Sequence, residues 1–464
     1  MNRESPLSAN SRRSFLRLGA LGLGGLSLGD VLRLRVAAGQ PVAPPDTSVI
    51  FIWLPGGPPH MEMYDMKPNA PSDFRGEFRP IRTNVPGMEV CELLPLHAKC
   101  ADKYTLIRSI AHTFSDHGGG HKRFLTGRLP AEPTGTLNDS PAVGSIVAKL
   151  REQVDVGLPN YIGGTDQGRH HVDVFAFGAA YLGPKYVPFN CAGDPSQPDF
   201  EVKNLALDAS LADRLDNRIQ LLKGFDRLQN RIDASGVMES MDRFSQQALS
   251  LMTSPKAREA FDLSREPQAL RERYGMHGWG QRALLARRLV EAGCSFVTMV
   301  MENPYISGVP FAKNGTYNWD SHAVNCHIFE DARLRFPIYD QAVTALVEDL
   351  HARGLTKKVM LIVTGEFGRT PRISHDPKNG NRPGRDHWPQ AMSMLVCGGG
   401  MRHGQIIGST NSRGEHPHDR PLTPNDLWAT VYRHLDIDPS MTFPDHAGRP
   451  MPILPFGEPI RELL

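Results

Sequence analysis

Apolar residues recur along the chain in short runs of strand length. Five such runs span residues 48–54, 104–110, 295–301, 359–363 and 392–396. Helical patterns precede two of them, at residues 282–292 and 339–352. Continuous apolar strands that alternate with amphipathic helices are typical of a mostly parallel sheet covered on both faces. The pattern therefore predicts an α/β fold, in which ligands gather at the carboxyl ends of the strands.

A charged, glycine-poor segment interrupts this alternation between about residues 195 and 275. Its apolar residues follow steps of three and four and form one face of a long helix; they are Leu211, Leu215, Ile219, Leu222, Phe225, Leu228 and Ile232. We expect a helical insertion within a single domain, not a separate catalytic domain. Near the C-terminus, Thr423 and Pro424 form a helix start, which predicts a helix to about Leu435.

The N-terminal segment has the features of an export signal. Arg12 and Arg13 precede a glycine- and leucine-rich run at residues 18–28, and small residues follow at 36–38. Paired arginines before such a run predict a twin-arginine signal peptide over residues 1–38 and a mature domain over 39–464. The run is shorter than the roughly 20 residues that cross a bilayer, so we expect a periplasmic or extracellular protein with no stable membrane span after cleavage.

Composition and charge narrow the class of protein. The 464 residues are 40% hydrophobic and 22% charged, as in ordinary globular proteins. The formal net charge is +2, and the predicted signal peptide carries six arginines against Glu4 and Asp30, which leaves the mature chain slightly acidic. No basic patch indicates a nucleic-acid partner. The six cysteines form no CxxC pair, and Cys91 and Cys100 are close enough in sequence for a disulfide in an oxidising compartment.

Histidines and acids follow several of the predicted strands. His117 and His121 flank three glycines, and a helix starting within the glycines would bring both imidazoles to its N-terminus, where backbone N–H groups favour an anion. Two histidines at this spacing are also a common metal-binding arrangement. Asp320 and His322 are two residues apart in a segment that also holds His327, a spacing that lets both reach one ion. Two surface histidines and an acid that starts a turn are the alternative interpretation.

The segment after residue 363 combines an acid, a base and a return loop. Glu366 and Arg369 follow the strand, and Asp386 and His387 return after a glycine- and asparagine-rich excursion. A solvated loop is the alternative, but acids and imidazoles recur at three strand ends, so we expect one shared crevice. After the first strand, Gly56 and Gly57 precede His60 and Asp65; these two side chains could point into the same site, although a turn explains the glycines equally well.

The order of these motifs carries a resemblance. The chain reads "HGGGHKRFLTGR", "WDSH", "TGEFGR", "GRDHW" and "CGGGMRHGQIIG", which resembles the alkaline phosphatase and sulfatase superfamily. More closely, it is similar to an uncharacterised, twin-arginine-exported bacterial family of that superfamily, marked by "GEFGRTP" and "GRDHWP". The resemblance covers nearly all of the mature chain and implies an alkaline phosphatase-like core.

The resemblance also implies roles for individual residues. The sulfatase nucleophile lies nine residues before the Thr of Leu-Thr-Gly-Arg, which places His117 where a cysteine or serine is usual. Asp320, His322 and His387 match metal ligands, and Glu366-Phe367 stands in place of an Asp-His pair. The aspartate at the end of the first strand is replaced by Gly56 and Gly57, and Asp65 is a possible substitute.

Two hypotheses follow. In the first, the protein is a metal-dependent hydrolase of phosphate or sulfate esters, including sulfated or phosphorylated glycans; a divalent zinc, calcium, magnesium or manganese ion neutralises the transferring group. Its expected metal ligands are Asp320, His322, Glu366, Asp386 and His387, and its expected catalytic residues are His117, His121 and Arg369. In the second, the site has lost its nucleophile and the protein is a secreted binding protein for anionic glycans or a scaffold that recruits a partner.

Overall fold

The computed structural model describes residues 46–135, 137–154, 156–166, 177–200, 202, 254–305 and 313–464. The predicted signal peptide at 1–38 lies outside this part of the chain, and so does the predicted helix from Leu211 to Ile232. Of the expected insertion, the structure describes two helices at its end, α10 (Pro255–Phe261) and α11 (Gln268–Tyr274). Within the described ranges, no helix is both long and apolar enough to cross a membrane.

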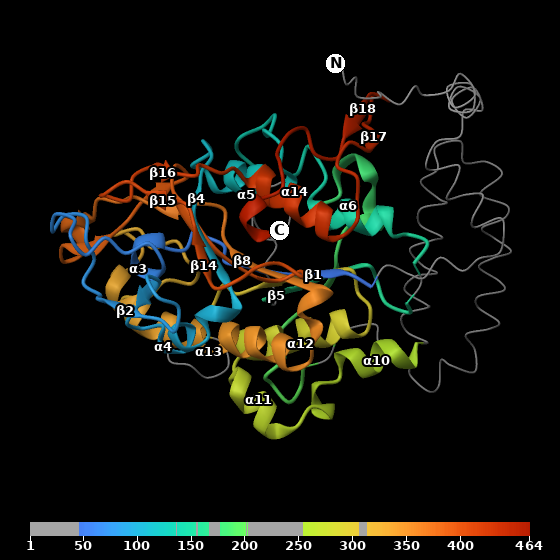
Figure 1. Ribbon diagram of the computed structural model, residues 1–464, viewed down its shortest axis with the longest axis horizontal. Helices are drawn as coiled ribbons and strands as arrows, with labels where there is room; N and C mark the ends of the chain where they lie inside the picture. The colour runs from blue at the N-terminus through green and yellow to red at the C-terminus, as the bar shows by residue number, and fades with distance from the viewer. Residues whose placement is uncertain are drawn as a thin grey trace, which may run out of the picture. The chain divides into compact units, whose positions relative to one another are not determined.

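The centre of the fold is an eight-stranded sheet (Figure 1). Its order is β14 (Gln405–Ile407), β4 (Thr105–Ile110), β13 (Met392–Gly398), β8 (Val359–Thr364), β1 (Ser48–Trp53), β7 (Phe296–Val300), β5 (Tyr161–Thr165) and β6 (Phe189–Ala192). Strand β13 runs antiparallel to both of its neighbours, and the remaining pairs are parallel. All five apolar runs form strands of this sheet, so the predicted mostly parallel α/β fold is confirmed.

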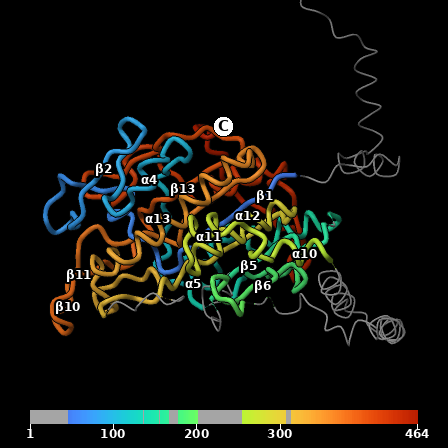
Figure 2. The backbone as a smooth tube through the Cα atoms, turned by 90° about the horizontal axis from the view of Figure 1, so that it is seen from below, coloured from blue at the N-terminus to red at the C-terminus, as the bar shows by residue number. Residues whose placement is uncertain are grey.

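Helices cover both faces of the sheet because the side chains of each central strand alternate between them. In β1, Ile50 and Ile52 belong to one apolar core, which includes residues of α12 (Gly278–Glu291) and α13 (Ile328–Ala352). Val49, Phe51 and Trp53 belong to the other, with α5 (His117–Thr126), α6 (Val143–Leu150) and α14 (Pro424–His434). Figure 1 shows these two helical layers on opposite sides of β1, and Figure 2, seen from below, looks onto the layer with α12 and α13.

Local sequence signals explain where the covering helices begin. The helix predicted after Thr423 is α14, in which Thr423 and Asp426 form a capping box. Helix α13 begins earlier than its apolar pattern indicated, because His327 caps it by accepting a hydrogen bond from the backbone N–H of Glu330. His327 therefore has a structural role that accounts for its place in the sequence.

Two short helices and five two-stranded ribbons lie outside the main sheet in the described part of the chain. The helices are α3 (His60–Met63) and α4 (Pro95–Lys99), and the two-stranded ribbons are β2–β3 (Pro80–Arg82, Glu89–Cys91), β9–β12 (Gly368–Arg369, His387–Trp388), β10–β11 (Ser374–Asp376, Arg382–Gly384), β15–β16 (Ser409–Thr410, Pro417–Asp419) and β17–β18 (Thr442–Pro444, Pro450–Pro452).

The suggested disulfide between Cys91 and Cys100 is not formed. Both residues are buried free thiols within one apolar core. Burial raises the pKa of each thiol to about 12, which suppresses the thiolate that disulfide formation requires. The sulfur of Cys91 instead accepts a hydrogen bond from the backbone N–H of Leu93.

Candidate metal centre

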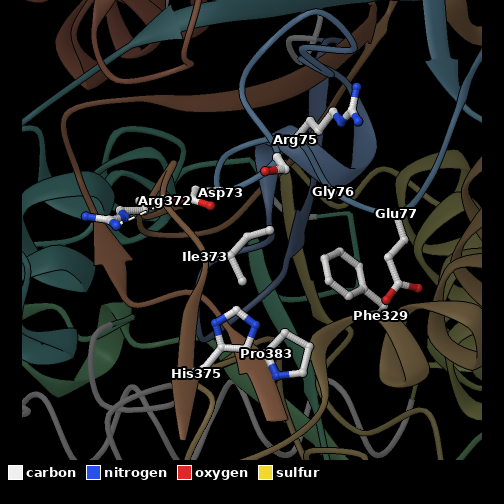
Figure 3. Close-up of a pocket in the computed structure, with 10 residues that line it drawn as sticks. Asp73, Arg75, Gly76, Glu77, Phe329, Arg372, Ile373, His375 and Pro383 are labelled. Carbon is white, nitrogen blue, oxygen red and sulfur yellow. Dashed lines mark hydrogen bonds and ion pairs between the residues drawn. The ribbon is translucent and has the colours of Figure 1, made fainter. Parts of the chain in front are cut away.

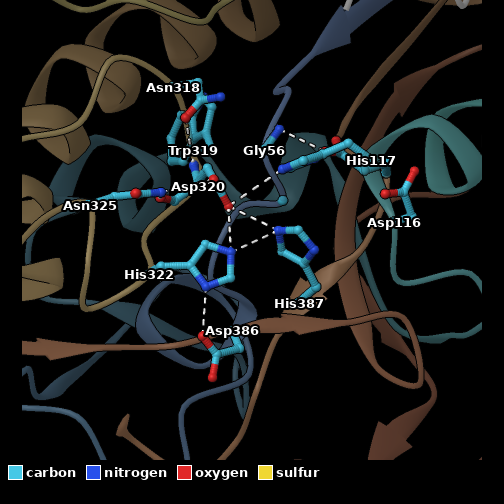
Figure 4. Close-up of polar contacts among 12 residues, drawn as sticks. Gly56, Asp116, His117, Asn318, Trp319, Asp320, His322, Asn325, Asp386 and His387 are labelled. Atoms are coloured by element: carbon cyan, nitrogen blue, oxygen red, sulfur yellow. Dashed lines mark hydrogen bonds and ion pairs between the residues drawn. The ribbon is translucent and has the colours of Figure 1, made fainter. Parts of the chain in front are cut away.

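The loops that follow three parallel strands meet at one edge of the sheet. Strand β4 leads to His117, β7 to the segment with Asp320, and β8 to Glu366. Because β12 pairs with β9, His387 lies directly opposite Arg369 and returns to the same edge. Hydrogen bonds or ion pairs link all eight residues predicted for the site there: His117, His121, Asp320, His322, Glu366, Arg369, Asp386 and His387. Figure 4 shows five of them, His117, Asp320, His322, Asp386 and His387.

Three ligand-type atoms converge at the centre of this cluster. Oδ1 of Asp320 lies 3.0 Å from Nε2 of His322 and 3.0 Å from Nε2 of His387. The two Nε2 atoms are 2.9 Å apart. Atoms that bind one zinc ion at about 2.0–2.1 Å in tetrahedral geometry lie roughly 3.3 Å apart. The observed triangle is therefore close to the spacing that a single small ion requires.

The outer nitrogen of each of these two rings has its own acceptor. Nδ1 of His322 donates to Oδ1 of Asp386 over 2.6 Å, and Nδ1 of His387 donates to the backbone oxygen of Ser115 over 2.6 Å. This fixes the tautomer and turns both Nε2 lone pairs toward Asp320, as in histidines that bind metals. Two imidazoles and one carboxylate suit zinc better than magnesium or calcium, which prefer oxygen ligands. These residues therefore fit zinc or a similar divalent metal ion.

Arg369 holds Asp320 in place from the buried side. Its guanidinium donates to Oδ1 of Asp320 over 2.6 Å and to the backbone oxygens of Gly57, Arg385, Trp319 and Gly56. The side chain of Arg369 is 0% exposed. Its donors therefore face protein groups, and a solvent-borne anion does not reach them directly.

A second group of residues lies beside the first. Glu366 is fully buried, and its Oε1 accepts hydrogen bonds from Nδ1 of His117 over 2.9 Å and from the backbone N–H of Gly56 over 2.8 Å. Nε2 of His121 is 3.6 Å from the same oxygen. His117 also faces the first group, since its Nε2 lies 3.6 Å from Oδ1 of Asp320. His117 thus lies between the two acids. Ligand atoms of His117, Asp320 and His387 lie close enough together to share a metal ion, and so do those of His117, His121 and Glu366.

Electrostatics in this cluster favour charged acids. Burial alone would raise the pKa of Glu366, but the charge of His121 and the hydrogen bond from His117 bring it to about 2. Burial would also raise the pKa of Asp320, yet His117, His322, His387 and Arg369 hold it far below its usual range.

The histidines respond in opposite directions. Burial lowers the pKa of His117, but hydrogen bonds to Asp320 and Glu366 outweigh it and bring the pKa to about 10. Burial also lowers the pKa of His322, but hydrogen bonds to Asp320 and Asp386 outweigh it, and the net shift is upward. For His387, burial dominates and lowers the pKa. Without a bound cation, the two acids thus favour the charged forms of His117 and His322.

Glycines around His117 permit its position. Asp116 caps α5 by accepting hydrogen bonds from the N–H groups of Gly118 and Gly119, so the helix begins at His117, just before the glycines. A Cβ atom on Gly118 would lie 2.3 Å from the backbone oxygen of Gly135, and one on Gly120 would lie 2.9 Å from the Phe367 ring. The glycines therefore allow close packing around the helix start.

The structure explains why the first strand ends without an acid. Gly56 has a φ of +107°, and a Cβ atom there would lie 2.5 Å from the backbone nitrogen of Asp320. The chain that carries Asp320 occupies the space that a side chain at position 56 would need. Asp65 does not replace the missing acid: it contacts Lys67 and the hydroxyl of Thr410. His60 lies behind Arg369, and its Nδ1 accepts a hydrogen bond from the backbone N–H of Arg369.

Three contributors to the cluster were not predicted as site residues from the sequence. The Phe367 ring packs 5.5 Å from the His117 ring and 4.4 Å from the His387 ring. Asn325 donates to Oδ2 of Asp320 over 2.9 Å, and Ser115 contributes only its backbone oxygen. An aromatic residue in place of a ligand, an amide and a carbonyl cannot be identified as site residues without the fold.

A surface pocket of about 450 Å³ lies elsewhere, between the loop at residues 72–77 and the β10–β11 ribbon. Figure 3 shows His375, Ile373, Phe329 and Pro383 around its centre, with Arg372 extending away. Arg372 is paired with Asp73. None of the eight predicted site residues lines this pocket.

Comparison with solved structures finds distant similarities. A sulfatase, PsFucS1 from Pseudoalteromonas sp., matches with a TM-score of 0.35 and 12% identity over 87% of this chain and 70% of its own. The phosphonate monoester hydrolase SpPMH from Silicibacter pomeroyi matches with 0.36 and 12% over 89% and 76%. The alkaline phosphatase from the Antarctic bacterium TAB5 matches with 0.35 and 10% over 84% and 98%.

Sequence comparison gives a direct assignment to a family. None of the curated proteins matches the chain significantly. A family model described as "Protein of unknown function (DUF1501)" matches residues 46–464, which is the whole domain that contains the sheet and the cluster. The expectation of an uncharacterised family is confirmed, and the chain belongs to the DUF1501 family.

Proposed function

We propose that the protein is an exported, metal-dependent hydrolase of phosphate or sulfate esters. The observation that carries the proposal is the inward-facing triangle of Oδ1 of Asp320 and Nε2 of His322 and His387, with sides of 2.9 to 3.0 Å. Three lone-pair-bearing atoms held this close repel one another unless a proton or cation lies between them. In this proposal, Asp320, His322 and His387 are the metal ligands.

The other acids orient the histidines in this proposal. Asp386 and Glu366, which the motifs suggested as ligands, each accept a hydrogen bond from the Nδ1 atom of a histidine. Such outer partners raise the basicity of a ligand and fix its ring. Arg369 is likewise a positioning residue, because its donors hold Asp320 and the backbone around it.

A divalent ion at this position would polarise the ester oxygen and offset negative charge on the transferring group. Side chains of Asp320, His322 and His387 are 17–21% exposed, so a substrate can reach the triangle from solvent. The ester class is supported by the sulfatase-like order of the sequence motifs. Phosphate and sulfate are both tetrahedral oxyanions, and a glycan that carries either group fits the proposal. Export is supported by Arg12 and Arg13 ahead of the apolar run.

Elemental analysis tests the metal site. We expect the wild-type protein, produced without residues 1–38, to hold a stoichiometric divalent metal, and Asp320→Ala and His387→Ala to lose it. His446→Ala is the control, because His446 is exposed and outside the cluster. The metal-loaded protein should then hydrolyse p-nitrophenyl phosphate or p-nitrophenyl sulfate. A folded wild-type protein that takes up no metal from replete medium would exclude the proposal.

A secreted binding protein for anionic glycans is the second candidate. It is favoured by the histidine at position 117, where sulfatases have a cysteine or serine. His121 and Arg369 are also fully buried, which removes them from direct contact with a substrate. Tight metal binding together with glycan binding, but no turnover of either ester, would select this candidate.

A further inference from the structure

We infer that His117 is a covalent nucleophile and that the protein hydrolyses phosphate esters through a phosphohistidine at Nε2 of this residue. The inference rests on the proposed function and deepens it, because it names both the attacking atom and the substrate class. It starts from the position of His117, the first residue of α5, between a buried acid and the ligand triangle.

The two nitrogens of His117 have different surroundings. Nδ1 donates to Oε1 of Glu366 over 2.9 Å, and that oxygen is fixed in turn by the backbone N–H of Gly56. Nε2 faces Asp320 at 3.6 Å. In the neutral form of His117 the carboxylate holds the remaining proton on Nδ1, and the lone pair of Nε2 then faces the ligand triangle, where the ester would bind. An acid that orients an imidazole in this way is the usual support of a reactive histidine.

His117 differs from the other histidines of the cluster. Nε2 of His322 and of His387 lie closer to Asp320, at 3.0 Å, in the ligand triangle. His121 is fully buried beside Trp53. The His117 side chain is 28% exposed, and its ring lies 4.3 Å from the His387 ring and 5.5 Å from the Phe367 ring. Its ring is therefore fixed by packing and also open to a substrate.

The reaction balances in two displacements. In the first, the Nε2 lone pair attacks phosphorus and the bond from phosphorus to the ester oxygen breaks. The electron pair leaves with that oxygen, which takes a proton from water to give the alcohol. The ring carries a positive charge while the N–P bond exists, and the adjacent Glu366 carboxylate stabilises it.

In the second displacement, water attacks phosphorus and the N–P bond breaks. Its electron pair returns to Nε2, and the water gives its proton to solvent. The net reaction converts ester and water into alcohol and phosphate, with no oxidant or further reactant. The phosphoryl group is the substrate class because it transfers reversibly to and from imidazole nitrogen.

The first test looks for the covalent intermediate. The metal-loaded protein is mixed with p-nitrophenyl phosphate, quenched in alkali, in which phosphohistidine survives, and analysed by peptide mass spectrometry. We expect a phosphoryl group on His117 and none after acid treatment. His117→Gln should lose the adduct and at least about 100-fold of the rate while it keeps the metal, and His446→Gln should behave as wild type.

A second measurement applies even if the intermediate does not accumulate. p-Nitrophenyl phosphate and phenyl phosphate form the same phosphohistidine, so the ratio of transfer to water and to added glycerol should be the same for both esters. A ratio that changes with the leaving group would overturn the inference, and so would His117→Gln retaining the wild-type rate. Loss of metal in His117→Gln, without any adduct in the wild type, would instead make His117 a ligand. These outcomes leave the proposed hydrolase intact, whereas a wild type with neither metal nor turnover removes both.

Discussion

The Nε2 atoms of His322 and His387 lie 2.9 Å apart, and both face Oδ1 of Asp320. The two histidines are far apart in sequence, one before α13 and one in β12. They meet because each outer nitrogen is held by an acceptor, Asp386 or the backbone of Ser115. A pair of imidazoles oriented this way needs a cation to be stable when both rings are neutral.

Asp386→Asn should weaken metal binding without unfolding the protein. Asparagine can still accept the hydrogen bond from Nδ1 of His322 through its amide oxygen, but this neutral group raises the basicity of the ring less than a carboxylate does. We expect a 10- to 100-fold weaker affinity for zinc, measured by competition with a chromophoric chelator. The Asp386 side chain is 58% exposed, so the melting temperature of the metal-free protein should change little. Unaltered zinc affinity would show that Asp386 does not support the site.

Arg369→Met should destabilise the whole domain. The substitution removes the cation that pairs with Asp320 and leaves the backbone oxygens of Gly57 and Arg385 without their buried donors. Breaking a buried ion pair on one side costs about 3–5 kcal/mol. Urea unfolding of the metal-free protein measures this loss. The control is Arg372→Met, because the side chain of Arg372 is 73% exposed in its pair with Asp73. This substitution should lower the free energy of unfolding by less than about 1 kcal/mol. Equal effects of the two substitutions would contradict the positioning role of Arg369.

The main sheet could be predicted from the sequence because its strands are buried on both faces. Runs such as residues 359–363 are continuously apolar, and that pattern does not depend on distant contacts. Strands β5, β6 and β14 were missed. Gly163 and Gly164 in β5, Asn190 in β6 and the short span of β14 give no apolar run of strand length. The place of β5 and β6 in the sheet depends on pairing with β7 and with each other.

The candidate site was predictable as a set of residues and less so as a set of roles. Acids and imidazoles at strand ends identify the cluster, because parallel strands bring their carboxyl ends to one edge. The role of each residue depends on which ring nitrogen faces which oxygen, and no spacing encodes that. Glu366 illustrates this: the motif suggests a ligand, and the fold places its Oε1 against Nδ1 of His117.

Gly56→Ala should damage both stability and the metal centre. Its φ of +107° disfavours any Cβ, and the added atom would lie 2.5 Å from the backbone nitrogen of Asp320. Gly448→Ala is the matched control, because Gly448 has a φ of +78° and open space around it. We expect the control to lose about 1–2 kcal/mol from the backbone strain alone and to keep its metal. Gly56→Ala should lose more and bind zinc more weakly; similar results for both would show that the approach of Asp320 is not tight.

Acid should destabilise the domain partly through His60, which is buried beneath the site. Burial lowers the pKa of His60 to about 4, and the hydrogen bond to the backbone oxygen of Gly414 only partly opposes it. The unfolded chain has a pKa near 6.5 at this residue, so between pH 6.5 and 4 the unfolded state binds more protons than the folded state. The free energy of unfolding must then fall as the pH falls, by up to about 1.4 kcal/mol per pH unit from this residue. Above pH 6.5 both states are neutral at His60 and the contribution vanishes.

His60→Gln isolates this contribution, because glutamine can still donate to the Gly414 oxygen and does not titrate. Urea unfolding of the metal-free proteins at several pH values between 7 and 4 gives the two slopes. We expect the variant to be less pH-dependent than the wild type, with the curves converging as the pH falls and the wild type losing about 3 kcal/mol more over the window. Chelation of metal during the measurement matters, since protons compete with a metal ion for His322 and His387. Parallel curves for the two proteins would mean that His60 is protonated in the folded state and that its burial is relieved on acidification.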